Sequence, residues 1–239
     1  MPKVAKWYEF KNVTATSADL YILGDIAADY WGSWQPEDQY PEKIRNFLTE
    51  VAGKDLDIYI NSGGGSVFGG LAIYQMIRRH AQTNRVKVHV DGLAGSIASV
   101  IAFAGSEAPE IPANAFLMIH NPAATTTGNA EELRKMAEAL DTVKTGILAV
   151  YMEHVTEGVT EEEVSALMDA ETWLTGTEAA KYFQVETSAA REYVAAVGDN
   201  ISCYKHIPRD LTREKTPAPE DVAARVEIRQ MMISACTTI

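Results

Sequence analysis

Short apolar runs with strand character alternate with helix-like segments along most of the chain. Apolar runs bounded by turn-forming residues are the expected strands, at residues 20–26, 56–60, 86–90, 115–119 and 172–175. Segments with helical spacing, or small and apolar throughout, are the expected helices, at residues 41–51, 71–80, 97–104, 128–153, 161–168 and 177–183. Strands that alternate with helices are typical of an α/β domain with much parallel pairing. The sequence therefore predicts one α/β domain between residue 20 and about residue 183.

The composition changes past residue 198. Three prolines, Pro208, Pro217 and Pro219, interrupt a polar stretch there, and residues 220–233 have the spacing of a separate amphipathic helix. We therefore expect a folded domain over residues 1–198 and a C-terminal tail or linker over residues 199–239.

Charge and cysteine content restrict the partners and the compartment. Lysine and arginine number 21 against 33 acidic residues, which gives a net charge of −12 at pH 7. Phosphate binding needs clustered basic residues, so neither a nucleic acid nor an anionic membrane surface is expected as a partner. Cys203 and Cys236 are too few for a disulfide framework and suit a reducing, cytoplasmic compartment. The first nine residues lack an apolar core, so no secretory signal is expected, and no apolar stretch is long enough to span a bilayer.

Ser96 is the first candidate for chemistry. It follows Gly95 and opens the expected helix at residues 97–104. Backbone N–H groups and the positive end of the helix dipole would stabilise an oxyanion there. Serine is also a common helix cap, so the pattern alone leaves both roles open. Ala94 and Ala98 exclude the Gly-x-Ser-x-Gly elbow.

A run of three glycines lies between an expected strand and an expected helix, at residues 63–65. The lysine of a phosphate-binding loop is absent, and Phe68 stands where a dinucleotide fingerprint needs its third glycine. The run permits close backbone approach to a ligand, or it is a flexible turn.

His120, Asp169 and Glu171 are the remaining candidates. His120 directly follows the expected strand at residues 115–119, and strand ends that feed loops often carry catalytic groups. Asp169 and Glu171 precede the strand at residues 172–175. If that strand begins early enough to include both, their side chains lie on the same face because they are two residues apart. Either carboxylate can then orient an imidazole. A structural histidine and solvated acids are the alternatives. No His or Cys pair has metal-ligand spacing, so no metal and no cofactor are expected.

Four motifs occur in a characteristic order. They are Ile-Asn-Ser-Gly-Gly-Gly (60–65), Asp-Gly-Leu-Ala-Gly-Ser-Ile-Ala-Ser (91–99), Met-Ile-His-Asn-Pro (118–122) and Glu-Thr-Trp-Leu-Thr (171–175). Together they resemble the Clp protease proteolytic subunit (ClpP) family, over residues 20 to about 190. The resemblance is strongest to its phage and prophage branch, the head maturation proteases.

The resemblance implies an ATP-independent serine endopeptidase with a crotonase-like fold of repeated β-β-α units. Such subunits are homo-oligomers that stack as rings and enclose their active sites. The expected helix at residues 128–153 would correspond to the protruding handle helix that carries ring-to-ring contacts. The substrate would be a protein or peptide, in the phage setting a scaffold or capsid precursor. The N-terminal segment does not match the loops that dock an unfoldase ring, so the resemblance leaves an ATPase partner open.

The resemblance also implies residue roles. Ser96 would be the nucleophile and His120 the general base, because serine at its free pKa is a weak nucleophile. Backbone N–H groups of Gly65 and Ile97 would hold the oxyanion.

Two positions depart from the family pattern. The family's proline before the glycine pair is Gly63 here, and an ungapped match places Glu171 where the family usually has aspartate. Asp169 is the alternative acid.

Three other functions remain open on the sequence. A crotonase-like acyl-CoA enzyme would use the glycine-rich backbone as its oxyanion hole. A Ser–Lys peptidase would use Lys135 or Lys144 as the base. A non-enzymatic ring or scaffold protein would keep only the fold.

Overall fold

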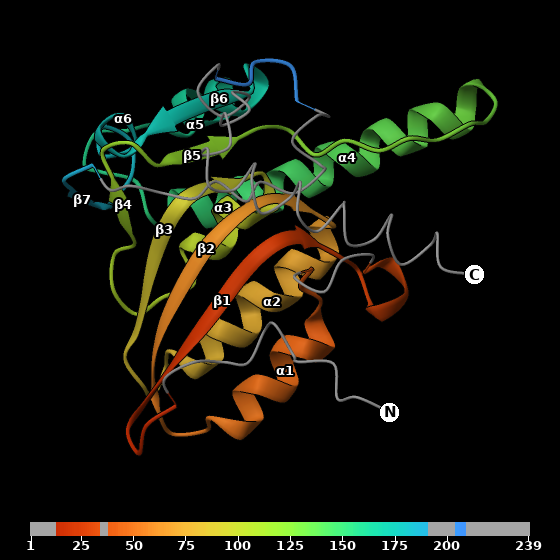
Figure 1. Ribbon diagram of the computed structural model, residues 1–239. Coiled ribbons are helices and arrows are strands. Elements are labelled where there is room, and N and C mark those ends of the chain that lie inside the picture. Colours follow the sequence, from red (N-terminus) through yellow and green to blue (C-terminus); the bar gives the residue numbers. More distant parts are fainter. Residues whose placement is uncertain (1–12, 34–37, 191–203, 209–239) are drawn as a thin grey trace, which may run out of the picture. The chain divides into compact units, whose positions relative to one another are not determined.

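The computed structural model describes residues 13–33, 38–190 and 204–208. Within these ranges seven strands form one sheet, in the order β1-β2-β3-β4-β7, with β5 beside β3 and β6 beside β5 (Figure 1). All pairs are parallel except β5 with β6. The strands are β1 (Ser17–Ile26), β2 (Asp55–Gly65), β3 (Val86–Gly95), β4 (Glu110–Pro112), β5 (Phe116–Ile119), β6 (Thr172–Thr175) and β7 (Glu186–Ser188).

Helices occupy the segments between the strands, as the alternation predicted. They are α1 (Pro41–Glu50), α2 (Val67–His80), α3 (Ile97–Ala102), α4 (Ala130–Met152), α5 (Glu161–Asp169) and α6 (Gly176–Ala179), with a 3₁₀ turn at Tyr30–Gly32. The mixed α/β class is therefore confirmed. Strands β4 and β7 were not predicted, because three residues are too few to show a period of two.

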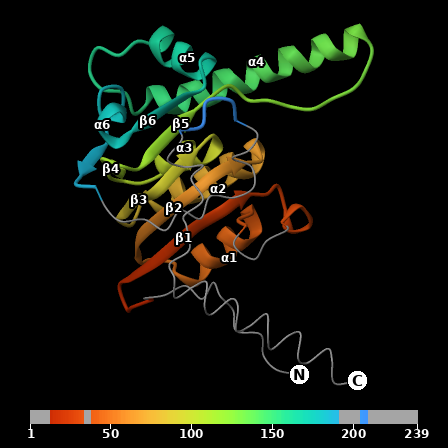
Figure 2. The same ribbon diagram turned by 45° about the horizontal axis from the view of Figure 1, so that its top comes forward.

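The main core lies between the sheet and helices α1 and α2, which cover the same face in both views (Figures 1 and 2). Alternate residues of β1 and β2 are buried, as a strand with one covered face requires. Ile44 and Phe47 of α1 and Ile73 and Ile77 of α2 pack into the same cluster. This packing fixes the carboxyl ends of β2 and β3, where the candidate residues lie.

Helix α4 begins with the expected capping box. Asn129 accepts hydrogen bonds from the first turn, and Glu132 bonds back to the Asn129 backbone. Its apolar stripe is buried only near the C-terminal end, at Ile147, Leu148 and Tyr151, whereas Leu133 is 45% exposed. The first turns of α4 extend beyond the sheet (Figures 1 and 2).

The chain divides into a compact unit over Met1–Ile207 and a second over Pro208–Ile239. The expected helix at residues 220–233, together with Cys203 and Cys236, lies outside the described residues. Residues 204–207, which the sequence assigned to the tail, belong to the first unit. Among the described helices, none is long and apolar enough to cross a membrane.

Candidate active site

The carboxyl ends of β2 and β3 lie against each other, and Gly64 is the point of contact. Gly64 has φ +99, and a Cβ there would lie 2.7 Å from both the Gly95 carbonyl oxygen and the Ser96 Cβ. Only glycine meets both conditions without displacing the neighbouring turn. Gly65 also has a positive φ, +143, and a Cβ there would collide with the backbone of Ile26. The glycine run is therefore a site of close backbone approach and not merely a flexible turn.

Ser96 has a strained backbone that directs its side chain away from the helix it precedes. Its φ of 52 and ψ of −126 lie in a region that non-glycine residues rarely adopt, and its side chain makes no cap hydrogen bond. The Ser96 N–H donates to the Met118 carbonyl oxygen at 2.8 Å, which ties the residue to β5. The capping role that the sequence left open is thus not what this hydroxyl does.

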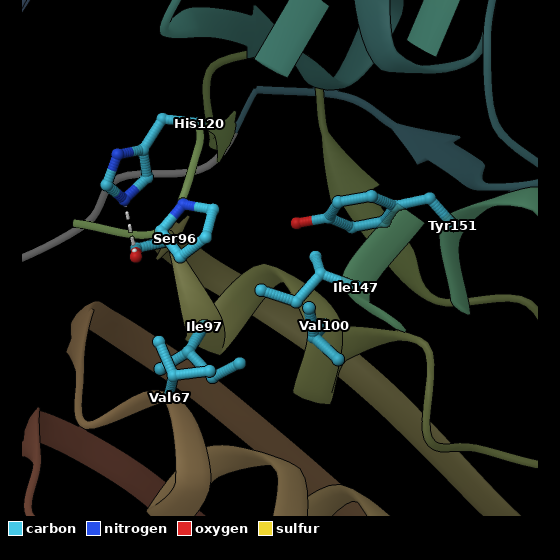
Figure 3. Close-up of a pocket in the computed structure, with 8 residues that line it drawn as sticks. Val67, Ser96, Ile97, Val100, His120, Ile147 and Tyr151 are labelled. Carbon is cyan, nitrogen blue, oxygen red and sulfur yellow. Dashed lines mark hydrogen bonds between the residues drawn. The ribbon is translucent and has the colours of Figure 1, made fainter. Parts of the chain in front are cut away.

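His120 forms a hydrogen bond with the hydroxyl group of Ser96. The Ser96 Oγ lies 2.7 Å from the His120 Nε2 (Figure 3). Burial lowers the pKa of His120 below its ordinary value of 6.5, and the nearby Glu171 carboxylate partly opposes this by raising it. The imidazole is therefore neutral at pH 7 and able to accept the serine proton.

Glu171 lies next to His120 because of the β5–β6 register. Ile119 pairs with Thr172 in this antiparallel ladder, so His120 and Glu171 are the residues that directly continue it. The Glu171 backbone has a positive φ of 50. Its Oε1 accepts hydrogen bonds from the backbone N–H groups of Lys205, at 2.7 Å, and His206, at 2.8 Å. Within the part of the chain that the structure describes, no carboxylate is hydrogen-bonded to His120.

Asp169 has a different environment. It is the last residue of α5, and β6 begins only at Thr172. Asp169 and Glu171 therefore do not lie on one face of a strand, as the sequence suggested. The Asp169 Oδ1 accepts hydrogen bonds from Asn121 Nδ2 at 2.7 Å and Lys144 Nζ at 2.6 Å. The Lys144 bond, and then the Asn121 bond, lower the pKa of Asp169.

Both lysines that a Ser–Lys mechanism would need are paired with carboxylates. Lys144 bonds to Asp169, and Lys135 lies 2.8 Å from Glu131 in the exposed part of α4. The Ser96 hydroxyl instead has the histidine as its partner.

A small pocket opens beside Ser96 and His120 (Figure 3). Its walls are mainly apolar and are formed by Val67, Ile97, Val100, Pro122 and Ile147.

One polar group in this pocket was not expected from the sequence. Tyr151 points into it from α4, and its hydroxyl lies 2.7 Å from the Ser99 Oγ. Burial raises the pKa of Tyr151, so the phenol stays neutral. Its position in the apolar stripe of the helix gave no signal of a polar role.

Ile97, one of the two predicted oxyanion donors, lies at the start of α3 and close to the glycine run. Ile97 is the first residue of α3, so its N–H has no partner within the helix. A Cβ at Gly64 would lie 3.1 Å from this nitrogen, which shows how closely the glycine turn approaches it. Gly65 as the second donor stays a prediction. In the described ranges, no three His, Cys, Asp or Glu side chains are grouped to hold a metal ion.

The family follows from sequence comparison. The sequence model of the family described as Clp protease matches residues 42–187, which is more than half of the chain. The chain belongs to the Clp protease family. The matched range includes Ser96, His120, Asp169 and Glu171.

Three relatives illustrate the similarity. The ATP-dependent Clp protease proteolytic subunit of Bacteroides fragilis is 32% identical over 136 residues, 56% of this chain and 63% of the relative. Subunit 1 of Streptomyces avermitilis is 34% identical over 138 residues, 57% of this chain and 62% of the relative. Subunit 3 of Rhodococcus jostii is 35% identical over 133 residues, 54% of this chain and 62% of the relative. The chain thus spans a little under two thirds of the length of these relatives.

Proposed function

We propose that this Clp protease family member is a serine endopeptidase that hydrolyses peptide bonds without ATP. The observation that carries the proposal is the 2.7 Å contact between Ser96 Oγ and His120 Nε2, at a serine whose strained backbone keeps it from capping its helix. A nucleophile within hydrogen-bond reach of a neutral base is the arrangement that activates a hydroxyl. The names of the relatives, all proteolytic subunits, support the same reaction.

The proposed mechanism has two stages. His120 takes the Ser96 proton as Oγ attacks the peptide carbonyl, and returns it to the leaving amine as the acyl-enzyme forms. Water then attacks the ester, again with His120 as base. The oxyanion of each tetrahedral intermediate accepts hydrogen bonds from the Gly65 and Ile97 N–H groups, each worth about 3 kcal/mol in comparable proteases. Glu171 fixes the tautomer of His120 and stabilises the imidazolium.

Asp169 has a separate role in the proposal. Its bonds to Asn121 and Lys144 tie the loop after His120 to α4, so it supports the base indirectly. The choice of Glu171 as the acid rests on the strand register, which places it beside His120.

The pocket supports a preference in the substrate. Walls made of valine, isoleucine and proline favour an apolar group next to the scissile bond. The finer proposals rest on the sequence resemblance: a crotonase-like fold, homo-oligomeric rings with α4 as the handle, a cytoplasmic location, and a phage scaffold or capsid precursor as substrate. The exposed Leu133 near the start of α4 agrees with a contact to a further copy of the chain.

Labelling with a fluorophosphonate, followed by peptide mapping, tests the reaction. The reagent should modify Ser96 in the full-length protein and should not modify the Ser96→Ala variant. An acyl-CoA enzyme or an inactive scaffold would leave Ser96 unlabelled. A Ser–Lys enzyme would still be labelled in a His120→Ala variant, whereas the proposed mechanism predicts that labelling is lost.

A further inference from the structure

A short segment from beyond the family match lies against the candidate site. Residues 204–206 stand beside β6 in both views, at the blue end of the colour scale (Figures 1 and 2). The Tyr204 ring meets the His120 ring edge-on, with centroids 5.1 Å apart, and the Trp173 ring at 6.0 Å. The same tyrosine donates its hydroxyl hydrogen to the Gly63 carbonyl oxygen at 2.6 Å. One side chain therefore contacts the base, β6 and the glycine turn.

The backbone of this segment binds the carboxylate of Glu171, the acidic residue beside His120. A single oxygen of Glu171 accepts hydrogen bonds from two successive amides, those of Lys205 and His206. The Glu171 side chain is only 13% exposed. Hydrogen bonds to an ionised acceptor in such surroundings are among the stronger ones in proteins. Although the strand register places Glu171 beside His120, its bonding is directed to the segment.

The segment also uses a backbone acceptor close to Ser96. Gly63 lies at the carboxyl end of β2, next to Gly64, which contacts Ser96. A peptide that approached along this turn would meet a carbonyl already bonded to Tyr204.

From these contacts we propose that residues 204–206 form an autoinhibitory latch that keeps the Glu171 carboxylate from hydrogen-bonding to His120 and covers the base. The latch rests on the proposed peptidase function. In the closed state Ser96 and His120 are paired but the imidazole lacks its orienting carboxylate. Release of residues 204–206 frees Glu171 to turn to His120 and exposes the glycine turn to substrate. Activity then depends on the fraction of molecules in the open state.

A matched pair of substitutions at one position tests the latch in the full-length protein. Lys205→Pro removes the N–H that bonds to Glu171, whereas Lys205→Ala keeps that N–H and changes only the side chain. We expect kcat/KM for a short peptide to be about tenfold higher in the proline variant than in the alanine variant. Tyr204→Phe, which loses the bond to Gly63 but keeps the ring, should raise it by a smaller factor. Equal or lower activity of the proline variant would overturn the latch.

A second measurement does not depend on activity. The pKa of His120, followed by NMR on ¹³C-labelled histidine, should be higher in Lys205→Pro than in Lys205→Ala, because a freed carboxylate next to the imidazole favours its charged form. An unchanged pKa would overturn the latch whatever the activity. If no variant hydrolyses peptides or is labelled at Ser96, the proposed function fails, and the pKa comparison still decides whether the segment holds Glu171.

Discussion

Ser66 and Ser96 both stand before a helix that follows a parallel strand, and both donate their N–H to a carbonyl of a neighbouring strand. Ser66 bonds to Ile26 at 2.7 Å and Ser96 to Met118 at 2.8 Å. Ser66, with φ −63 and ψ 117, turns its Oγ to the Gly69 N–H at 3.2 Å and caps α2. Ser96, with φ 52 and ψ −126, makes no such bond. Backbone conformation, not residue type, decides whether a serine in this position caps a helix or faces a histidine.

The largest expected effect separates the reactive serine from the capping one. Ser96→Ala should lower kcat for peptide hydrolysis by about 10⁶, as loss of the nucleophile does in a comparable triad. Because the side chain makes no cap bond, the unfolding midpoint in denaturant should stay close to that of the wild type. Turnover by this variant at a tenth of the wild-type rate would show that Ser96 is not the nucleophile.

The two carboxylates near His120 provide the next comparison. Glu171→Gln keeps the shape and loses the charge, and should lower kcat by about 10⁴, by analogy with an amide replacement in another triad. Asp169→Asn is the matched control and should cost far less, because Asp169 bonds to Asn121 and Lys144 instead of His120. Steady-state kinetics of both variants decides which acid serves the base, and a larger loss in Asp169→Asn would reverse the assignment.

The glycine turn tests whether close approach shapes Ser96. Gly64→Ala adds a Cβ that would lie 2.7 Å from the Ser96 Cβ, and should lower kcat about a hundredfold by displacing the nucleophile. Gly53→Ala is the control, because Gly53 also has a positive φ, +78, but has open space around it. That variant should lose roughly 1 kcal/mol of unfolding free energy and keep its kcat. Similar kcat values for the two variants would mean that the close contact at Gly64 does not matter.

The pH dependence measures the state of the base. Activity needs neutral His120, and burial lowers its pKa below 6.5, so the midpoint of the acid limb of kcat/KM should lie below pH 6.5. Glu171→Gln removes a charge that raises this pKa, so its acid limb should move to still lower pH. Asp169→Asn should leave the limb in place. If the acid limb of kcat/KM in the wild type had its midpoint above pH 6.5, this would contradict a His120 pKa that burial lowers.

The smallest expected effect concerns the capping serine. Ser66→Ala removes the bond to the Gly69 N–H and should lower the free energy of unfolding by about 1 kcal/mol. Urea denaturation of Ser66→Ala and Ser96→Ala, side by side, measures the difference. If both variants lose the same stability, the contrast between the two helix starts is wrong.

Local patterns predicted much of this molecule, and contacts distant along the chain account for most of the rest. The strands and helices carry their own periodicity, and the Asn129 cap is complete within four residues. The positive φ of Ser96 could not be read from its neighbours, because contacts with Gly64 and Met118 surround that turn. The partners of Glu171 come from residues 205 and 206, in a stretch that the sequence assigned to a tail. No sequence period links such positions.

The hydrogen bond from the Ser96 amide to Met118 has a consequence for motion. It joins the nucleophile to the strand that leads directly into His120, so we expect the two residues to move together when the sheet fluctuates. The Ser96 amide should therefore exchange its proton for deuterium only when a large part of the domain opens. Inactivation on heating would then coincide with cooperative melting of the sheet, without an earlier loss of alignment between hydroxyl and imidazole.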